Sequence, residues 1–153
     1  MLAKKRTIKT NSKTSNNIVI RWLNVCRMAQ YLIDMNLHYK KEYSEVLRNG
    51  IKKHTIRKKE IAIGKILKHI IYPYQPNKRE CVLENKCISV QKIKITDAYY
   101  INDRKVYIDG RLLSLEEKQQ LAWNDGFPSL LAFFLYFTEP FEGYIIHFTD
   151  LRY

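Results

Sequence analysis

Hydrophobic and polar positions alternate over much of this chain and predict a protein built mainly from strands. Residues 37–40 read apolar, polar, apolar, polar, which is the period-two pattern of a strand. Residues 43–47 place apolar side chains at helical spacing, and Gly50 is a suitable residue to follow the end of that helix. Residues 81–95 form either one long strand or a bent pair. Further strands are expected where β-branched and aromatic residues gather, at 54–58, 66–72, 105–109 and 144–148.

Two short helices are predicted in the C-terminal third of the chain. Ser114 begins a capping box, in which its side chain and that of Glu117 satisfy free amide groups at the start of a helix. We expect this helix to end near Asp125. Pro128 is expected to start a second helix, and residues 130–137 are apolar on almost all sides, so this helix should be largely buried.

The order of these elements favours an α+β fold in a single domain. Most strands follow one another without an intervening helix, so we expect a mixed or antiparallel β-barrel flanked by short helices. Residues 35–153 are expected to form this domain, and residues 1–34 a basic N-terminal arm that is partly disordered. The arm is either a functional extension or an appendage created by a start upstream of Met35. The intact mass of the native protein distinguishes these possibilities, because a mass that includes residues 1–27 contradicts a late start.

The charge of the chain predicts a polyanionic partner. The sequence has 27 Lys and Arg against 15 Asp and Glu, a formal net charge of +12. Nucleic acid is the first candidate and an anionic membrane surface the second, while a solvated basic surface is the alternative. No apolar run reaches the roughly 18 residues of a membrane helix, and the N-terminus lacks the apolar run of a signal peptide. We therefore expect a cytoplasmic protein without a membrane partner.

Cysteine, histidine and glycine patterns exclude several common classes of site. Three sparse cysteines argue against a disulfide framework and favour a reducing compartment. No Cys or His pair has the spacing of a structural zinc site, so we expect no metal and no cofactor. The sequence has no phosphate-binding Walker motif, dinucleotide-binding glycine motif, HExxH metalloprotease motif or GxSxG nucleophile motif.

Candidate chemistry is concentrated in residues 50–57, which read Gly-Ile-Lys-Lys-His-Thr-Ile-Arg. A lysine, a hydroxyl and a guanidinium group this close together can bind phosphate or carry out acid–base chemistry. In a regular strand, Lys53, Thr55 and Arg57 share one face, and Ile56 points to the core with the neighbouring histidine beside it. The alternative is an edge strand that its charges keep soluble.

Basic residues crowd the surrounding sequence, and tyrosines are interleaved with them. Tyr39 and Tyr43 lie within a region that has ten Lys and Arg and only three Glu. Such a mixture is typical of a surface that contacts nucleic-acid backbone and bases, and a solvated face is the alternative. The ten basic residues are Lys40, Lys41, Arg48, Lys52, Lys53, Arg57, Lys58, Lys59, Lys65 and Lys68.

A carboxylate in a second segment completes the set of candidate groups. Asp125 lies in the sequence Trp123-Asn-Asp-Gly-Phe127, where a helix is expected to end. A carboxylate at such a place can act as a general acid or base if its surroundings raise its pKa. An Asp-Gly pair more often forms a turn.

Together these segments resemble an ASCH domain of the PUA-like superfamily, over about residues 35–153. The resemblance rests on Lys52-Lys-His-Thr-Ile-Arg57, on the Leu-Ala-Trp-Asn-Asp-Gly-Phe segment that ends at Phe127, and on the terminal run Gly143-Tyr-Ile-Ile-His-Phe-Thr-Asp-Leu-Arg152. More narrowly, it resembles small ASCH-like proteins of phages and Bacteroidetes-type bacteria. The resemblance implies a small β-barrel with a cleft that binds RNA or a modified nucleoside.

One branch of that family contains 4-acetylcytidine amidohydrolases, which use a lysine, a threonine and a glutamate. Carried over by motif, these roles fall on Lys52, Thr55 and Asp125, an aspartate where that branch has glutamate. The resemblance implies that Lys52 activates the Thr55 hydroxyl and that Asp125 protonates the leaving amine. Other ASCH proteins are ribonucleases, and the same groups could serve phosphodiester cleavage.

We therefore expect a monomeric domain that binds RNA or a nucleoside. An amidohydrolase acting on an acylated nucleoside, a ribonuclease and a non-catalytic interaction module are the alternatives. The candidate catalytic residues are Lys52, Thr55 and Asp125, and the candidate binding residues are Tyr39, Lys40, Lys53, Arg57 and Lys58.

Overall fold

A computed structural model describes residues 34–153 of the chain. The predicted arm, apart from its last residue, lies outside the described residues. The chain between Asp34 and Tyr153 alternates short strands with three helices and one 3-10 turn. Its elements are β1 Asp34–Tyr39, α2 Tyr43–Arg48, β2 His54–Arg57, β3 Ile66–Ile71, β4 Glu80–Lys86, β5 Ser89–Ile95, the 3-10 turn Ile101–Asp103, β6 Val106–Ile108, β7 Arg111–Leu112, α3 Leu115–Asn124, α4 Leu130–Tyr136 and β8 Phe141–His147.

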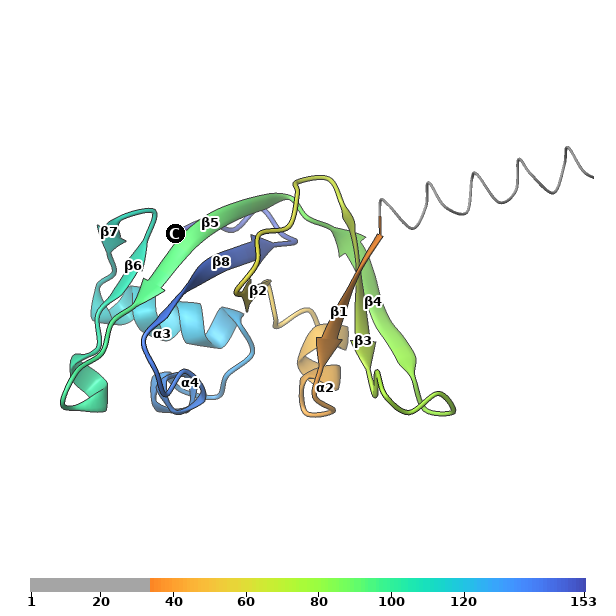
Figure 1. The fold of residues 1–153 in the computed structure, drawn as a ribbon, viewed down its shortest axis with the longest axis horizontal. Coiled ribbons are helices and arrows are strands. Elements are labelled where there is room, and N and C mark those ends of the chain that lie inside the picture. Colours follow the sequence, from red (N-terminus) through yellow and green to blue (C-terminus); the bar gives the residue numbers. More distant parts are fainter. Residues whose placement is uncertain (1–33) are drawn as a thin grey trace, which may run out of the picture. The chain divides into compact units, whose positions relative to one another are not determined.

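The strands form two sheets (Figure 1). One has three strands in the order β1-β3-β4, and the other has five in the order β2-β8-β5-β6-β7. The β1–β3 pair is parallel and the other pairs are antiparallel, which confirms an α+β fold with mixed pairing. Within residues 34–153 each sheet has two edge strands that pair on one side only, so both sheets are open. The strand pairing of these residues does not form the closed barrel that we expected.

The long segment 81–95 is a bent pair of strands rather than one strand. β4 belongs to the three-stranded sheet and β5 to the five-stranded sheet. The chain passes from one sheet to the other at Cys87, whose backbone N–H donates to the carbonyl of Lys65 at 2.9 Å. The Cys87 side chain is buried. This crossing, rather than barrel closure, accounts for the continuous β pattern in the sequence.

The helix boundaries follow the local sequence signals in two cases out of three. Gly50 follows α2 with a φ of +65°, and Ser114 caps α3 with the full capping box. For α4 the predicted range was confirmed to within one residue, but the helix starts at Leu130 after Ser129 as its cap, two residues beyond Pro128. The prediction that this helix is largely buried was wrong. Leu131 and Leu135 are 50% and 59% exposed, since only one side of the helix packs on the core.

Two hydrophobic cores lie on opposite faces of the five-stranded sheet. Adjacent residues of β8 point to different cores because side chains alternate along a strand. Ile145 packs with side chains of α3 and α4, including Leu121 and Phe133, whereas Ile146 packs with side chains of the three-stranded sheet and α2, including Leu67. The five-stranded sheet is therefore the middle layer of the described domain.

None of the helices in residues 34–153 is long and apolar enough to cross a membrane.

Candidate functional site

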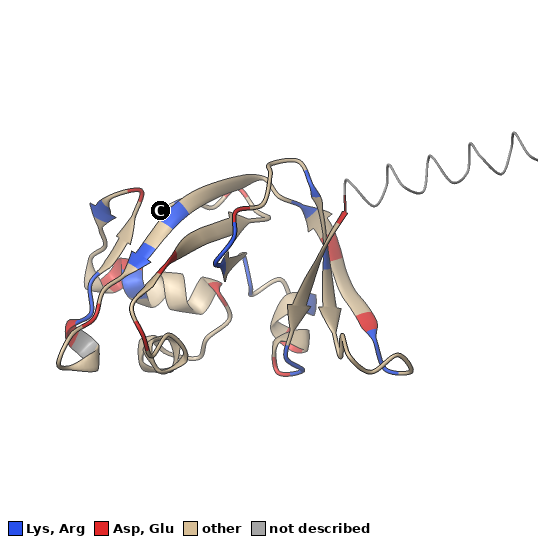
Figure 2. Ribbon diagram, viewed as in Figure 1, with Lys and Arg blue, Asp and Glu red and all other residues tan. Residues whose placement is uncertain are grey.

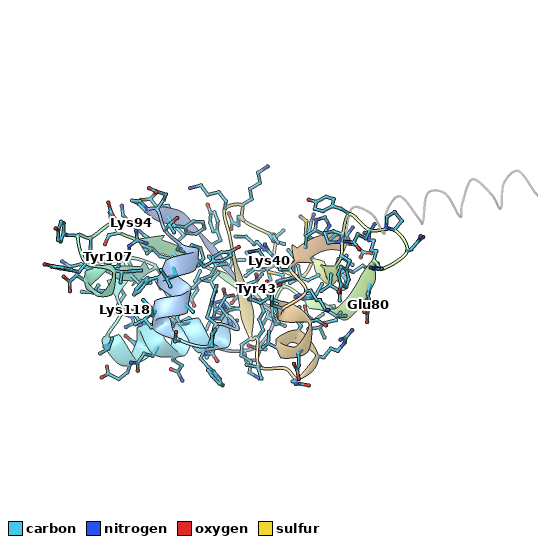
Figure 3. The ribbon with its side chains drawn as sticks, turned by 90° about the horizontal axis from the view of Figure 1, so that it is seen from below. Lys40, Tyr43, Glu80, Lys94, Tyr107 and Lys118 are labelled. Atoms are coloured by element: carbon cyan, nitrogen blue, oxygen red, sulfur yellow. The ribbon has the colours of Figure 1, made fainter. Side chains whose placement is uncertain are left out.

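A small cavity of about 80 Å³ lies beside β2, which is an edge strand of the five-stranded sheet. Its walls come from β1, α2, β2, the turn after α3, and α4. Figure 3 shows two of these residues, Lys40 and Tyr43, near one another. The lining residues are His38, Tyr39, Lys40, Tyr43, Lys52, Thr55, Ile56, Arg57, Asp125, Phe127, Tyr136 and Phe137.

Backbone hydrogen bonds hold the segment between α2 and β2 in the conformation that places Lys52 in the cavity wall. The N–H groups of Ile51 and Lys52 both donate to the carbonyl of Val46, so the chain turns back directly after α2. The N–H of Lys53 then donates to the carbonyl of Asn124 at 2.7 Å. These bonds tie the entry to β2 to the end of α3, and they set Lys52 opposite the next residue, Asp125.

Lys52 and Asp125 form a buried ion pair at the centre of the site. The Lys52 ammonium donates to Asp125 Oδ1 and to the Asp125 backbone carbonyl, each at 2.5 Å. The two residues are 3% and 5% exposed. The ammonium nitrogen also lies 5.1 Å from the centre of the Tyr43 ring and 5.7 Å from that of Tyr39, where an aromatic face attracts a cation.

A glycine allows this close approach. Gly126 has a φ of +87°, a conformation that side-chain-bearing residues rarely adopt. A Cβ atom at Gly126 would lie 3.1 Å from Val46 Cγ2 and 3.7 Å from Lys52 Cδ. The Asp-Gly pair therefore does form a turn, and this turn presents the Asp125 carboxylate to Lys52.

Behind the ion pair lies a second polar contact that the sequence did not reveal. His54 Nδ1 is 3.5 Å from Asp125 Oδ1, which is longer than an ordinary hydrogen bond. His54 Nε2 lies 2.8 Å from the Tyr153 hydroxyl, and Asn124 Nδ2 donates to that hydroxyl at 3.0 Å. We expected His54 in the core, and it is fully buried, but it packs beside the Asp125 carboxylate.

Burial changes the acid–base properties of these groups. Burial lowers the pKa of Lys52, with a smaller contribution from Arg57, against the opposing effect of Asp125. Burial alone would raise the pKa of Asp125, but the Lys52 charge and the contact with His54 outweigh it and bring this pKa below its usual value. Burial also lowers the pKa of His54. At neutral pH the site therefore holds an ionised Asp125, a neutral His54, and a lysine that releases its proton more readily than usual.

Tyr39 is a wall of the cavity with both ring faces covered. The His69 ring stacks on it at a centroid distance of 5.4 Å, and the Arg57 guanidinium lies 4.8 Å from its centre. Burial raises the pKa of Tyr39 to about 12, so its hydroxyl stays protonated. At the mouth, by contrast, Tyr136 is 53% exposed and Lys40 Nζ lies 5.9 Å from its ring centre. Tyr136, rather than Tyr39, has a ring that a planar ligand can reach.

The structure brings most of the predicted site residues together. All three candidate catalytic residues line the cavity, as do three of the candidate binding residues, namely Tyr39, Lys40 and Arg57. Lys53 and Lys58 do not line it. Lys53 takes part through its backbone, and the Lys58 ammonium lies 5.4 Å from the Phe141 ring centre.

Three further residues of the site were missed, namely His54 as a neighbour of Asp125, Tyr136 and Tyr153. Tyr136 was assigned to a buried helix because the surrounding residues are all apolar. Tyr153 lies nearly one hundred positions from His54 in sequence, and no spacing rule connects them.

No group of three or more His, Cys, Asp or Glu residues suited to a metal ion occurs among residues 34–153. Comparisons of this chain with models of protein families, with curated proteins and with solved structures gave no match. The likeness to ASCH domains stays a prediction that rests on the sequence motifs.

Proposed function

We propose that the cavity binds the base of an RNA nucleotide or of a nucleoside. The observation that carries this proposal is the Lys52–Asp125 pair, which is buried in the wall of a cavity that several aromatic side chains also line. Burying two charges costs several kcal/mol per ion, and apolar residues in their place are often neutral or stabilising. Strongly perturbed, paired groups of this kind are typical of functional sites.

The polar groups of the cavity suit the edge of a planar heterocycle. The Asp125 carboxylate can accept a hydrogen bond from an exocyclic amine, while Lys52 or Thr55 donates to a neighbouring ring nitrogen or carbonyl oxygen. Bases removed from a stack are read in this way, by hydrogen bonds to one edge and by stacking on aromatic rings. The exposed ring of Tyr136 is the candidate stacking partner.

The size of the cavity limits how much of the ligand enters. Sites for whole drug-sized molecules have volumes of about 300–1,000 Å³, whereas this cavity has about 80 Å³. An adjoining groove of about 360 Å³ shares His38, Tyr39 and Lys40 with the cavity and adds Lys41 and Tyr74. We assign the edge of the base to the cavity, and the sugar and phosphate to the groove with its two lysines.

The ASCH and PUA-like assignment is part of this proposal. Two open sheets that share a core, with short helices beside the outer face of one of them, are our candidate counterpart of the PUA-like barrel. The motif residues Lys52, Thr55 and Arg57 line the cavity together with Asp125, which supports the assignment.

Calorimetric titration with cytidine, uridine, adenosine, guanosine and 4-acetylcytidine tests the binding proposal. We expect one of these to bind, and Asp125→Asn to weaken that binding at least tenfold because the carboxylate acceptor is lost. Lys53→Gln is the matched control, since it removes the neighbouring charge without changing the cavity lining. Wild-type protein that binds none of the five, or an Asp125→Asn variant with unchanged affinity, would contradict the proposal.

An amidohydrolase is the second candidate, favoured by the lowered pKa of Lys52 in the same cavity as Thr55. In the molecules whose Lys52 has released its proton, Thr55 Oγ1 would attack the amide carbonyl carbon while the hydroxyl proton passes to the Lys52 amine. Lys52 would then return that proton to the leaving amine as the C–N bond breaks, and water would hydrolyse the threonine ester. Asp125 is ionised and suits the role of holding Lys52, so the proton donor differs from the one that the family resemblance implied.

Release of cytidine and acetate from 4-acetylcytidine tests this reaction. We expect activity to be lost in Thr55→Val, which has the same shape without a hydroxyl, and to persist at a lower rate in Thr55→Ser. Equal activity of Thr55→Val and wild type would eliminate threonine as the nucleophile. A wild-type protein that binds 4-acetylcytidine without releasing acetate would leave binding as the function.

A further inference from the structure

One end of the five-stranded sheet has a face that no other part of residues 34–153 covers. Pairing places Tyr144 of β8 opposite Lys92 of β5, and Lys94 of β5 opposite Tyr107 of β6. These side chains share one face, because residues paired across strands point to the same side of a sheet. Helices α3 and α4 pack on the opposite face. The core shared with the three-stranded sheet covers this face at Ile146 and also contacts Val90 and Tyr144. Figure 2 shows blue, basic segments along β5.

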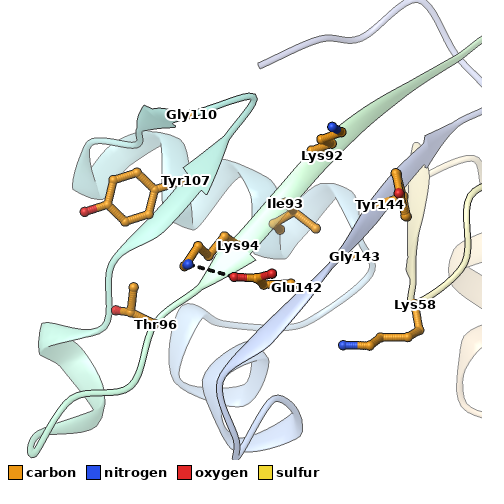
Figure 4. A pocket seen from close by; sticks show the side chains of 10 residues that line it. All are labelled: Lys58, Lys92, Ile93, Lys94, Thr96, Tyr107, Gly110, Glu142, Gly143 and Tyr144. Atoms are coloured by element: carbon orange, nitrogen blue, oxygen red, sulfur yellow. Dashed lines mark ion pairs between the residues drawn. The ribbon is translucent and has the colours of Figure 1, made fainter.

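The open face is hollowed as well as basic. A hollow of about 810 Å³ is lined by three lysines, two tyrosines, one glutamate and smaller residues. Figure 4 shows how they are arranged, with Lys58 reaching from the segment after β2 toward β8. The charged and aromatic residues are Lys58, Lys92, Lys94, Glu142, Tyr107 and Tyr144.

Most of the positive charge of this face has no partner. Lys94 forms an ion pair with Glu142 at 2.7 Å, the interaction drawn as a dashed line in Figure 4. Within the described part of the chain, neither the Lys58 nor the Lys92 ammonium has a carboxylate at ion-pair distance. A carboxylate-rich partner or a phosphate chain would complement these two charges.

We propose that this open face binds a single strand of RNA. Surfaces that bind single strands combine lysines that follow the phosphates with aromatic rings on which bases stack. Lys58 and Lys92 supply the first kind of contact, and the partly exposed rings of Tyr107 and Tyr144 the second. The hollow, unlike the cavity at Lys52, is large enough for whole nucleotides.

Charge argues against two other occupants of the same face. Residues 1–33 contain seven Lys and Arg and no Asp or Glu, so this segment would be repelled. A second copy would present the same basic face, on a chain whose net charge is already +12. A polyanion therefore fits the face better than either of them.

The face leads to the cavity through Arg57. Arg57 is paired with Tyr144 across the sheet and also lines the cavity beside Lys52. A strand that lies on the face is thus positioned to deliver one of its bases to the cavity. This delivery rests on the proposed function, whereas binding of the strand by the face does not.

Fluorescence anisotropy with a labelled single-stranded RNA decamer, titrated with the full chain at several salt concentrations, tests the proposal. We expect the double variant Lys58→Gln/Lys92→Gln to bind at least tenfold more weakly. The slope of log affinity against log salt should fall by about 1.4, since each phosphate contact to a single strand contributes about 0.7. Tyr107→Ala should weaken binding roughly five- to hundredfold through lost stacking. The basic N-terminal segment is present in every variant, so these differences report on the face.

Lys86→Gln is the matched control, because Lys86 is an exposed strand lysine on the other sheet. It should bind like wild type. Unchanged RNA affinity and salt slope in the double variant would overturn the proposal, as would a wild-type protein that binds anionic phospholipid vesicles but not the RNA.

The same variants separate this proposal from the proposed function. A double variant with weak RNA binding but normal nucleoside binding supports the open face as an independent site. If the wild-type protein binds the RNA but no nucleoside, the proposal that the cavity binds a nucleoside is contradicted, and the proposal that the open face binds RNA is supported.

Discussion

The domain contains one buried and one exposed lysine–carboxylate ion pair, and the pKa of the lysine is lowered in the buried pair and raised in the exposed one. Lys52 and Asp125 are buried in the cavity, and burial lowers the pKa of the lysine. Lys94 and Glu142 lie on the open sheet face, where the hydrogen bond to Glu142 raises the pKa of the lysine. Water stabilises both partners of the exposed pair whether or not they meet, whereas each buried charge depends on the other. This difference matches the two proposals, which assign selective contacts to the cavity and exchangeable contacts with a polyanion to the open face.

The sharpest test of this comparison is to remove one partner from each pair. Asp125→Ala leaves the Lys52 ammonium buried without a counter-charge, and we expect the free energy of unfolding to fall by about 3–5 kcal/mol. Glu142→Ala should leave it unchanged within the error of urea titration. Similar losses in the two variants would show that the two pairs do not differ as described.

The double variant Lys52→Met/Asp125→Leu separates a functional pair from a structural one. It replaces both charges with apolar side chains, and its stability should lie close to that of wild type, while nucleoside binding should be lost. A double variant as unstable as Asp125→Ala would indicate that the pair is needed for folding.

A glycine in each region gives a second comparison. Gly126 and Gly110 both have a positive φ, of +87° and +85°. A Cβ at Gly110 meets nothing within 4 Å, whereas at Gly126 it meets Val46 at 3.1 Å. We expect Gly110→Ala to cost about 1–2 kcal/mol from backbone strain alone, and Gly126→Ala about 2–4 kcal/mol because crowding is added. Equal losses in thermal or urea unfolding would contradict the tight contact at Gly126.

Acid should destabilise the domain through a histidine buried near the cavity. Burial lowers the pKa of His69, which packs against Tyr39, to about 4. Between about pH 6.5 and pH 4 the unfolded chain binds a proton at this residue and the folded chain does not, so stability falls as pH falls through this window. We expect His69 to account for about 3 kcal/mol of that loss.

Unfolding titrations of wild type and His69→Gln at pH 7 and pH 4.5 measure this contribution. The variant should lose less stability between the two pH values. An identical loss would assign the pH dependence to other groups.

The smallest expected effect is the coupling between Lys94 and Glu142. A double-mutant cycle with Lys94→Gln and Glu142→Gln should give no measurable coupling at 0.15 M salt, because water and ions screen exposed charges. A coupling energy between Lys94 and Glu142 as large as that of a buried pair would contradict the stated difference between the exposed and the buried ion pair.

Signals that act within a few residues were readable from the sequence. Gly50 after α2 and the capping box at Ser114 are local features, and both were predicted correctly. The grouping of Lys52 and Thr55 with Asp125 was also anticipated, through the resemblance of their sequence segments to the ASCH pattern.

Features set by tertiary packing were not readable. The pattern over residues 81–95 is equally compatible with one sheet or two, because the separation depends on the crossing at Cys87. The apolar run in α4 concealed the fact that only one side of the helix, with Phe133 and Phe134, meets a core. The contact between His54 and Tyr153 depends on how the last residues of the described chain pack against β2.

The alternation of Ile145 and Ile146 along β8 has a consequence for how the domain unfolds. Strand β8 contributes side chains to both hydrophobic cores. If β8 unfolds, both cores lose packing contacts, so neither core can unfold while the other stays intact. The helical layer and the three-stranded sheet are thereby energetically coupled, and the domain should unfold in one cooperative, two-state transition.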